Sequence, residues 1–193
     1  MHSLDCIYRR VARPWTADEL ADRHQAAYRR GSNDLPAGEP PPERPITLLA
    51  TAVPRLISLA VAANVLHVLP DTRSQAGAGV AVGLLATIDA TATGSLLRCQ
   101  LALEADGRSR GYHPDEWLPL AYEQTAEWLE QASPTSETPA LIEHAQQAGR
   151  LAALAIGALD RDTPSVPEAI ADCIAHLLVV CVLADEARQN PPT

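Results

Sequence analysis

Aromatic residues are scarce in this sequence, and phenylalanine is absent. Aromatic side chains make up 4% of the 193 residues, whereas 47% of the residues are hydrophobic. The core must therefore be built from Leu, Val, Ile and Ala, and these small side chains recur at helical spacing. No run of alternating apolar and polar residues, bounded by turn residues, indicates a strand. The sequence predicts an all-α protein, a helical bundle of about six helices.

Paired cysteines and a positive charge balance are also missing. The four cysteines show no CxxC spacing, and buried free thiols behave as small hydrophobes. This usage, together with the lack of a signal-peptide pattern at the start of the chain, predicts a cytoplasmic protein. The net charge of −9 argues against nucleic acid and against a membrane as partners. A nucleotide ligand stays admissible because a small pocket can be locally cationic.

Prolines separate an N-terminal segment from the rest of the chain. Thr16 and Glu19 predict a capping box that opens a helix, which we expect to be a lid, an edge helix or a dimer contact. Residues 31–45 hold five prolines and two glycines, a composition typical of an extended linker. We therefore expect residues 1–45 to form a helix and a linker, and residues 46–193 to form the bundle domain.

Long apolar segments predict two antiparallel helix pairs, residues 46–104 and residues 138–188. The first pair could be mistaken for a transmembrane hairpin. Its uncharged stretch Leu56–Leu69 is too short to span about 30 Å of hydrocarbon, and Asp89 interrupts the return helix. We therefore expect buried core helices. A small-residue series, Gly79, Gly83, Ala86, Ala90 and Gly94, would let another backbone approach closely.

Each pair has an early arginine and an aspartate in its return helix. Folding the first pair about its turn places Arg55 level with Asp89, and folding the second places Arg150 within about a turn of Asp172. The repeated pattern suggests an internal duplication. It also makes each arginine and aspartate a candidate ion pair.

Two short segments of the second pair carry a family resemblance. Residues 145–152 read AQQAGRLA, and residues 168–172 read EAIAD at the opening of an apolar helix. They resemble segments of the MazG-type all-α nucleoside triphosphate pyrophosphohydrolases. In that family, carboxylates on two helices collect Mg²⁺, which neutralises the triphosphate and positions the attacking water. The resemblance covers about a quarter of the chain and implies a helical core that commonly dimerises.

The family's metal positions are largely replaced in this chain. Its glutamates fall on Gln146, Gln147, Arg150 and Ala169. Glu168 is one position away, which rotates its side chain by about 100° around the helix. Only Asp172 occupies a position where the family has a metal ligand. Because Mg²⁺ requires several hard oxygen ligands, the resemblance implies a copy that has lost its metal.

We interpret the protein as a binding or regulatory protein without catalytic residues, metal or cofactor. We expect a homodimer that binds a nucleotide or a small molecule. The Arg150 guanidinium would stand where the metal stood and pair with Asp172, with Gln146, Gln147 and Glu168 around it. The simpler reading is that Arg150 and Gln146 face water.

Two other functions stay open. The first is an active Mg²⁺-dependent pyrophosphohydrolase with rearranged acids, whose candidate ligands are Glu143, Glu168, Asp172 and Asp185. The second is an all-α interaction partner that engages another chain through its linker and N-terminal helix.

Some further side chains have two interpretations. Trp117 and Trp128 lie on a predicted helix over residues 113–132 and could stack on a nucleobase, but core anchors are the commoner role. Cys173 and His176 share a helix face and could begin a metal site. An interior histidine bonded to a neighbour is the more frequent arrangement.

Overall fold

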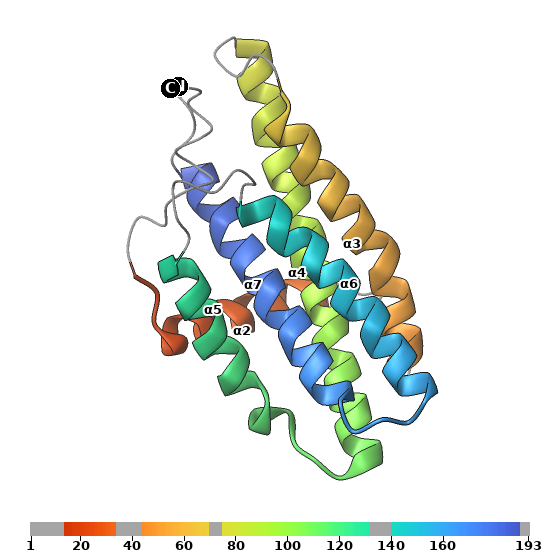
Figure 1. Cartoon of the computed structure of the whole chain (residues 1–193). Helices are drawn as coiled ribbons and strands as arrows, with labels where there is room; N and C mark the ends of the chain where they lie inside the picture. The colour runs from red at the N-terminus through yellow and green to blue at the C-terminus, as the bar shows by residue number, and fades with distance from the viewer. Residues whose placement is uncertain (1–13, 34–43, 70–74, 132–139, 190–193) are drawn as a thin grey trace.

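The computed structural model describes residues 14–33, 44–69, 75–131 and 140–189 (Figure 1). These residues form six α-helices and a short 3₁₀ helix, without a strand among them. The elements are α2 (Ala17–Asn33), α3 (Pro45–His67), α4 (Gln75–Arg110), η1 (Pro114–Glu116), α5 (Leu118–Gln131), α6 (Ala140–Asp160) and α7 (Val166–Gln189). The predicted all-α helical bundle is confirmed.

The two predicted helix pairs form the centre of the bundle. Helices α3 and α4 pack against each other, as do α6 and α7, and the pairs join because α3 also contacts α6 and α4 also contacts α7 (Figure 1). Small residues allow this packing. At Gly149 of α6, for example, an added Cβ would lie 3.8 Å from the Cβ of Leu56 on α3. The four long helices therefore share one aliphatic core.

Helix α7 is the most deeply buried element. It packs against α4, α6 and α5, and most of its side chains between Val166 and Ala184 are shielded from solvent. Each buried leucine or valine contributes about 1.5–3 kcal/mol through the hydrophobic effect. The prediction that this helix has neighbours on several sides is therefore confirmed.

The helix starts agree only in part with the expected caps. At α2, the backbone N–H of Thr16 donates to Glu19 Oε2 at 3.1 Å, and the N–H of Glu19 donates to Thr16 Oγ1 at 3.3 Å, which confirms that capping box. Ser165 and Glu168 have the spacing of a second capping box, at the start of α7. The hydroxyl of Ser165 instead lies 3.1 Å from the hydroxyl of Thr163 in the preceding turn. Thr138 and Pro139, the expected start of α6, lie outside the described residues.

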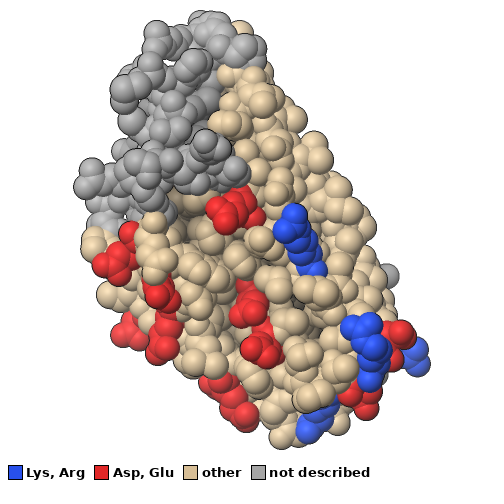
Figure 2. Space-filling model, in the orientation of Figure 1, with Lys and Arg blue, Asp and Glu red and all other residues tan. Residues whose placement is uncertain are grey.

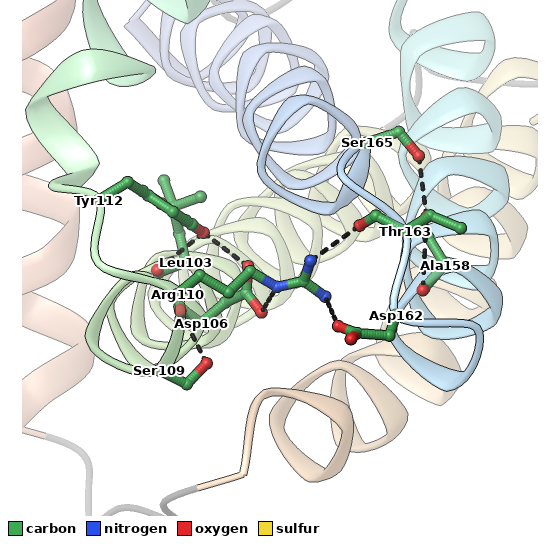
Figure 3. A network of polar contacts seen from close by, with 9 residues as sticks. All are labelled: Leu103, Asp106, Ser109, Arg110, Tyr112, Ala158, Asp162, Thr163 and Ser165. Carbon is green, nitrogen blue, oxygen red and sulfur yellow. Dashed lines mark hydrogen bonds and ion pairs between the residues drawn. The ribbon is translucent and has the colours of Figure 1, made fainter.

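A polar network at the end of α4 fixes the turn between α6 and α7 (Figure 3). Arg110 Nε donates to the buried carboxylate of Asp106 at 2.9 Å, and Arg110 Nη1 donates to the carbonyl of Thr163 at 3.0 Å. Arg110 Nη2 also pairs with Asp162, whose backbone has a φ of 53°. The hydroxyl of Tyr112 donates to the second oxygen of Asp106 at 2.8 Å. One arginine therefore links residues more than fifty positions apart.

The expected cytoplasmic location is wrong. Three helical segments, Pro45–His67, Ala76–Arg110 and Val166–Gln189, are each long and apolar enough to cross a membrane by length and composition. The argument against a transmembrane hairpin counted only uncharged stretches. A helix that includes one or two charged residues can still be long and apolar enough to cross a membrane. These helices point toward a membrane protein.

Charge is distributed unevenly over the surface. Figure 2 shows acidic residues on the side of the bundle where α5 and α7 lie, whereas the long edge formed by α3 is almost free of charge. Helix α3 contains no Asp or Glu, and α4 has no charged residue before Asp89. The bundle therefore has one acidic side and one apolar side.

Candidate functional site

Helix α7 has a single polar stripe on its otherwise buried first five turns. Glu168, Asp172 and His176 recur at four-residue steps, so they lie on one side of the helix. Glu168 and Asp172 are exposed and His176 is half-buried, whereas Ile170, Cys173, Ile174 and Leu177 are buried. The stripe is open to solvent between α5 and α6, the two helices that flank α7 on this side (Figure 1).

A cluster of three aromatic rings closes one end of the stripe. Nδ1 of His144, on α6, lies 2.6 Å from Nδ1 of His176. The Trp128 ring, from α5, stacks on the His176 ring with centroids 4.2 Å apart and planes inclined by 21°. Trp128 also lies 5.2 Å from the His144 ring. The cluster therefore joins one side chain from each of the three helices around the stripe.

Burial and mutual contact keep this histidine pair uncharged at neutral pH. Burial, and to a smaller extent the neighbouring His176, lowers the pKa of His144 to about 4. Two protonated imidazoles at this distance would repel each other. The fixed charges near the cluster are therefore the carboxylates of Glu168 and Asp172, which makes the stripe locally anionic.

The tryptophans have structural partners. Trp117 and Trp128 pack against Ala121 of α5 and against Ala171 and Ala175 of α7. Trp128 uses its face for His176, so the predicted role of core anchor describes it better than that of a free nucleobase platform. Among the described residues, the indole N–H of Trp117 is buried without a hydrogen-bond partner.

Cys173 and His176 do not share a site. The Cys173 Sγ lies 3.3 Å from the carbonyl oxygen of Ala148 and 3.6 Å from the Sγ of Cys99, inside the core. His176 turns toward α5 and α6 instead. Three residues of separation place two side chains about 60° apart around a helix, enough here to send one inward and the other to the stripe. Within the described helices, no group of three His, Cys, Asp or Glu residues could hold a metal ion.

The expected pairing of Arg150 with Asp172 is not formed. Both side chains are exposed, and no ion pair joins them among the described residues. The contact between Cys173 and Ala148 places Arg150 within about a turn of Asp172 along the two antiparallel helices. The level is therefore as expected, and the side chains stay apart because Arg150 lies on the outer face of α6. Gln146 is exposed on the same outer face, whereas Gln147 is half-buried nearer to the stripe.

Among the residues that the structure describes, Asp89 has three arginine partners, and Arg55 is not one of them. Its carboxylate oxygens lie 3.5 Å from Arg23 Nη2, 3.8 Å from Arg30 Nη1 and 3.1 Å from Arg188 Nη1. Arg23 also pairs with Asp185. Asp89 is almost completely buried, so these contacts compensate the cost of removing its charge from water. The cluster ties α2 and the end of α7 to α4.

Arg55 lies beside another arginine. The Nη1 atoms of Arg55 and Arg98 lie 3.5 Å and 3.6 Å from the point where a Cβ on Gly94 would be. Gly94 therefore leaves room for two guanidinium groups, and Arg98 donates to the Gly94 carbonyl at 2.7 Å. Asp89 is more than one turn away and points toward α2 and α7, which explains why the predicted pair does not form.

Comparison with known proteins gave no match among family models, curated proteins or solved structures. The resemblance to MazG-type proteins therefore stays a prediction, as do the homodimer and the internal duplication. The strongest candidate site is the stripe on α7 with its histidine–tryptophan cluster. Of its residues, the sequence singled out Glu168 and Asp172 as candidates, but not the contact of His144 with His176.

Proposed function

We propose that this protein is a binding or regulatory protein whose ligand docks on the stripe of Glu168, Asp172 and His176. In this proposal it descends from a MazG-like pyrophosphohydrolase and no longer hydrolyses nucleotides. The observation that supports it is the composition of α7. A helix buried along most of its length keeps one open polar stripe, flanked by side chains from two other helices.

A purely structural role does not account for the exposed part of the stripe. Glu168 and Asp172 are one turn apart, and like charges at that spacing destabilise a helix by a few tenths of a kcal/mol. Among the described residues, neither carboxylate forms an ion pair. Exposed, unpaired carboxylates on the central helix are free to meet a ligand.

The local charge selects the class of ligand. The stripe carries two carboxylates, and His144 is neutral at pH 7 because its pKa is about 4. A free nucleoside triphosphate would be repelled, whereas an organic cation or a nucleotide that carries its own divalent ion would be attracted. The three rings at the end of the stripe supply an apolar wall for the rest of such a ligand.

Thermal unfolding tests the proposal. The full chain is heated alone, with spermidine, with Mg²⁺ or Mn²⁺, and with each metal plus a nucleoside triphosphate, while pyrophosphate release is measured in parallel. A ligand present at 100 times its dissociation constant adds about 2.7 kcal/mol of apparent stability. We expect stabilisation by spermidine or by the metal–nucleotide mixture, without pyrophosphate release.

Two variants locate the binding. Asp172→Asn removes one charge from the stripe and should abolish the stabilisation, because Asp172 is exposed and has no ion pair. Asp22→Asn removes an exposed carboxylate from α2 and should leave the stabilisation unchanged. Pyrophosphate release that depends on metal would favour the active enzyme instead. A chain that responds to none of these additions would favour the protein-interaction alternative, and light scattering would then establish its oligomeric state.

A further inference from the structure

Of the three long apolar helices, α3 uses the least of its surface inside the fold. In the most apolar part of α7, 78% of the residues are buried within the protein, against 50% in α4 and 33% in α3. The apolar character of α7 is therefore explained by the core. The apolar character of α3 is not explained by the core, because about two thirds of the residues in its most apolar part are not buried.

The outer face of α3 carries a continuous apolar stripe. Its large side chains are exposed to between 37% and 70%: Ile46, Ile57, Val61, Val65 and Val68. With the exposed Ala50 they follow steps of three, four and seven residues, so they lie on one side of the helix. From the first to the last, the stripe extends over about 33 Å at a rise of ~1.5 Å per residue.

Three neutral polar side chains of α3 bond to their own helix. Thr51 Oγ1 donates to the Leu48 carbonyl at 2.8 Å. Ser58 Oγ donates to the Pro54 carbonyl at 3.0 Å, and Asn64 Nδ2 donates to the Ala60 carbonyl at 2.8 Å. Groups satisfied within the helix do not require water, which is the condition for a helix in contact with lipid.

The charge distribution orients the molecule. Helix α3 has no acidic residue, whereas Arg44 and Arg55 are exposed on it. Figure 2 shows acidic residues over the part of the visible face where α5 and α7 lie. Arg44 and Arg55 lie more than about 100° around the helix from the middle of the stripe. A surface approached through the outer face of α3 therefore meets apolar side chains and no charged residue of that helix.

We infer that the outer face of α3 docks on the surface of a lipid bilayer, with α3 parallel to the membrane plane and its apolar stripe among the upper acyl chains. An interfacial helix buries its apolar face by about 5–10 Å, so it need not span the hydrocarbon. At this depth the Arg55 guanidinium, which lies beside Gly94 of α4, stays on the side of α3 turned toward the bundle. The inference is independent of the ligand site on α7.

Vesicle flotation of the full chain tests this inference. Vesicles of pure phosphatidylcholine, and of phosphatidylcholine with phosphatidylglycerol, are used at low and at high salt. The wild type should float with both, and high salt should not release it from the neutral vesicles, because burial of apolar side chains is not screened by ions. If the wild type floated with neither kind of vesicle, the inference would be overturned.

Two variants with matched exposure make the test specific to α3. Ile57→Glu combined with Val61→Glu places charge at positions that are 60% and 57% exposed, so the fold should be retained. We expect the vesicle partition coefficient to fall by about tenfold or more. Leu120→Glu on α5, where the leucine is 57% exposed, should change it by less than about twofold. Equal losses in both variants would contradict docking through α3.

The alternative to a bilayer is a second copy of the chain, which would cover the apolar stripe of α3 in a dimer. In that case light scattering without lipid would show a dimer for the wild type and a monomer for the double variant, and neither would float. Hydrogen exchange provides a measurement on the unmodified chain. Vesicles should slow amide exchange in α3 and leave α5 unchanged. Protection of α5 instead of α3 would also refute the proposed orientation.

Discussion

His144 and His176 approach each other through the same ring atom, Nδ1, at a distance of 2.6 Å. One Nδ1 must therefore carry a proton while the other offers a lone pair, so the two imidazoles are opposite tautomers at this atom. A fourth proton, which would make both rings imidazolium, would leave two N–H groups facing each other. Burial is the main cause of the low pKa of His144, and the neighbouring His176 adds to it.

Acid should destabilise the fold through its buried histidines. The pKa of His24 and that of His144 are both lowered from 6.5 to about 4, in each case chiefly by burial. Between these values the unfolded chain binds more protons than the folded one, so stability is lost as pH falls from about 6.5 to about 4. His24, which is nearly fully buried, should account for about 3 kcal/mol of this loss.

Denaturant unfolding measured across this pH range checks the prediction. His24→Leu removes one titrating group and should flatten the dependence of unfolding free energy on pH by about one proton. The neutral-pH cost of the substitution, which includes the lost 2.8 Å contact with the Tyr122 hydroxyl, does not affect that slope. An unchanged slope would mean that His24 is accessible to protons in the folded state.

Removing the charge of Asp89 should loosen α2. Asp89→Asn removes a carboxylate from Arg23, Arg30 and Arg188. Arg23 keeps Asp185, and Arg30 and Arg188 are 49% and 43% exposed, so we expect a loss of about 1–2 kcal/mol. Urea unfolding should report a loss in this range, and hydrogen exchange should be accelerated in α2. Asp162→Asn is the matched control. That side chain is 90% exposed, and we expect a change within about 0.5 kcal/mol.

Two glycines in α4 should respond oppositely to alanine. At Gly107 a Cβ would lie 2.6 Å from the backbone carbonyl oxygen of Tyr112, which cannot move without breaking the turn. Gly107→Ala should therefore cost about 2 kcal/mol or more. At Gly79 nothing lies within 4 Å, so Gly79→Ala should stabilise by up to about 1 kcal/mol through helix propensity. Melting temperatures of both variants provide the measurement, and shifts of the same sign would contradict the prediction.

Arg110 should contribute more stability than its neighbour Arg108. Arg110→Met removes the contacts with Asp106, Asp162 and the Thr163 carbonyl, leaving a buried carboxylate that only Tyr112 still satisfies. We expect a loss of about 2–3 kcal/mol, measured by chemical denaturation. Arg108→Met, at an exposed position on the same turn, should change stability by less than about 0.5 kcal/mol. Equal losses of stability in the two variants would mean that the contacts of Arg110 do not stabilise the turn between α6 and α7.

Apolar periodicity was sufficient to predict the helices, because each long helix buries a stripe that recurs at three and four residues. In α2, for example, Leu20, His24 and Ala27 recur at this spacing, and all three are buried. The end of α4 was placed too early, at residue 104. Asp106 and Arg110 look like surface residues in the sequence, yet they extend the helix to Gly111, whose φ of 83° ends it.

The ion pairs were harder to predict because register and rotation both matter. Folding about the turn does bring α6 and α7 together, and the contact of Ala148 with Cys173 keeps Arg150 within about a turn of Asp172. Both side chains are exposed, however, and no ion pair joins them among the described residues. Asp89 was expected to face a partner in its own hairpin. The arginines that it contacts come from α2 and from the end of α7, and no local spacing relates those segments.

Helix α4 extends for about 54 Å, and its two halves have different mechanical properties. From Asp89 onward the helix is anchored by Asp89, Arg98 and Asp106, each held by contacts to other parts of the chain or to the helix itself. In the first half, Gly79 and Gly83 have open space around them and contribute weak helix propensity. On warming, α4 should therefore unfold locally from its N-terminal end, where the glycines lie, and this unfolding should stop near Asp89. The positions of the glycines and of the anchoring residues thus set the direction in which the helix unfolds.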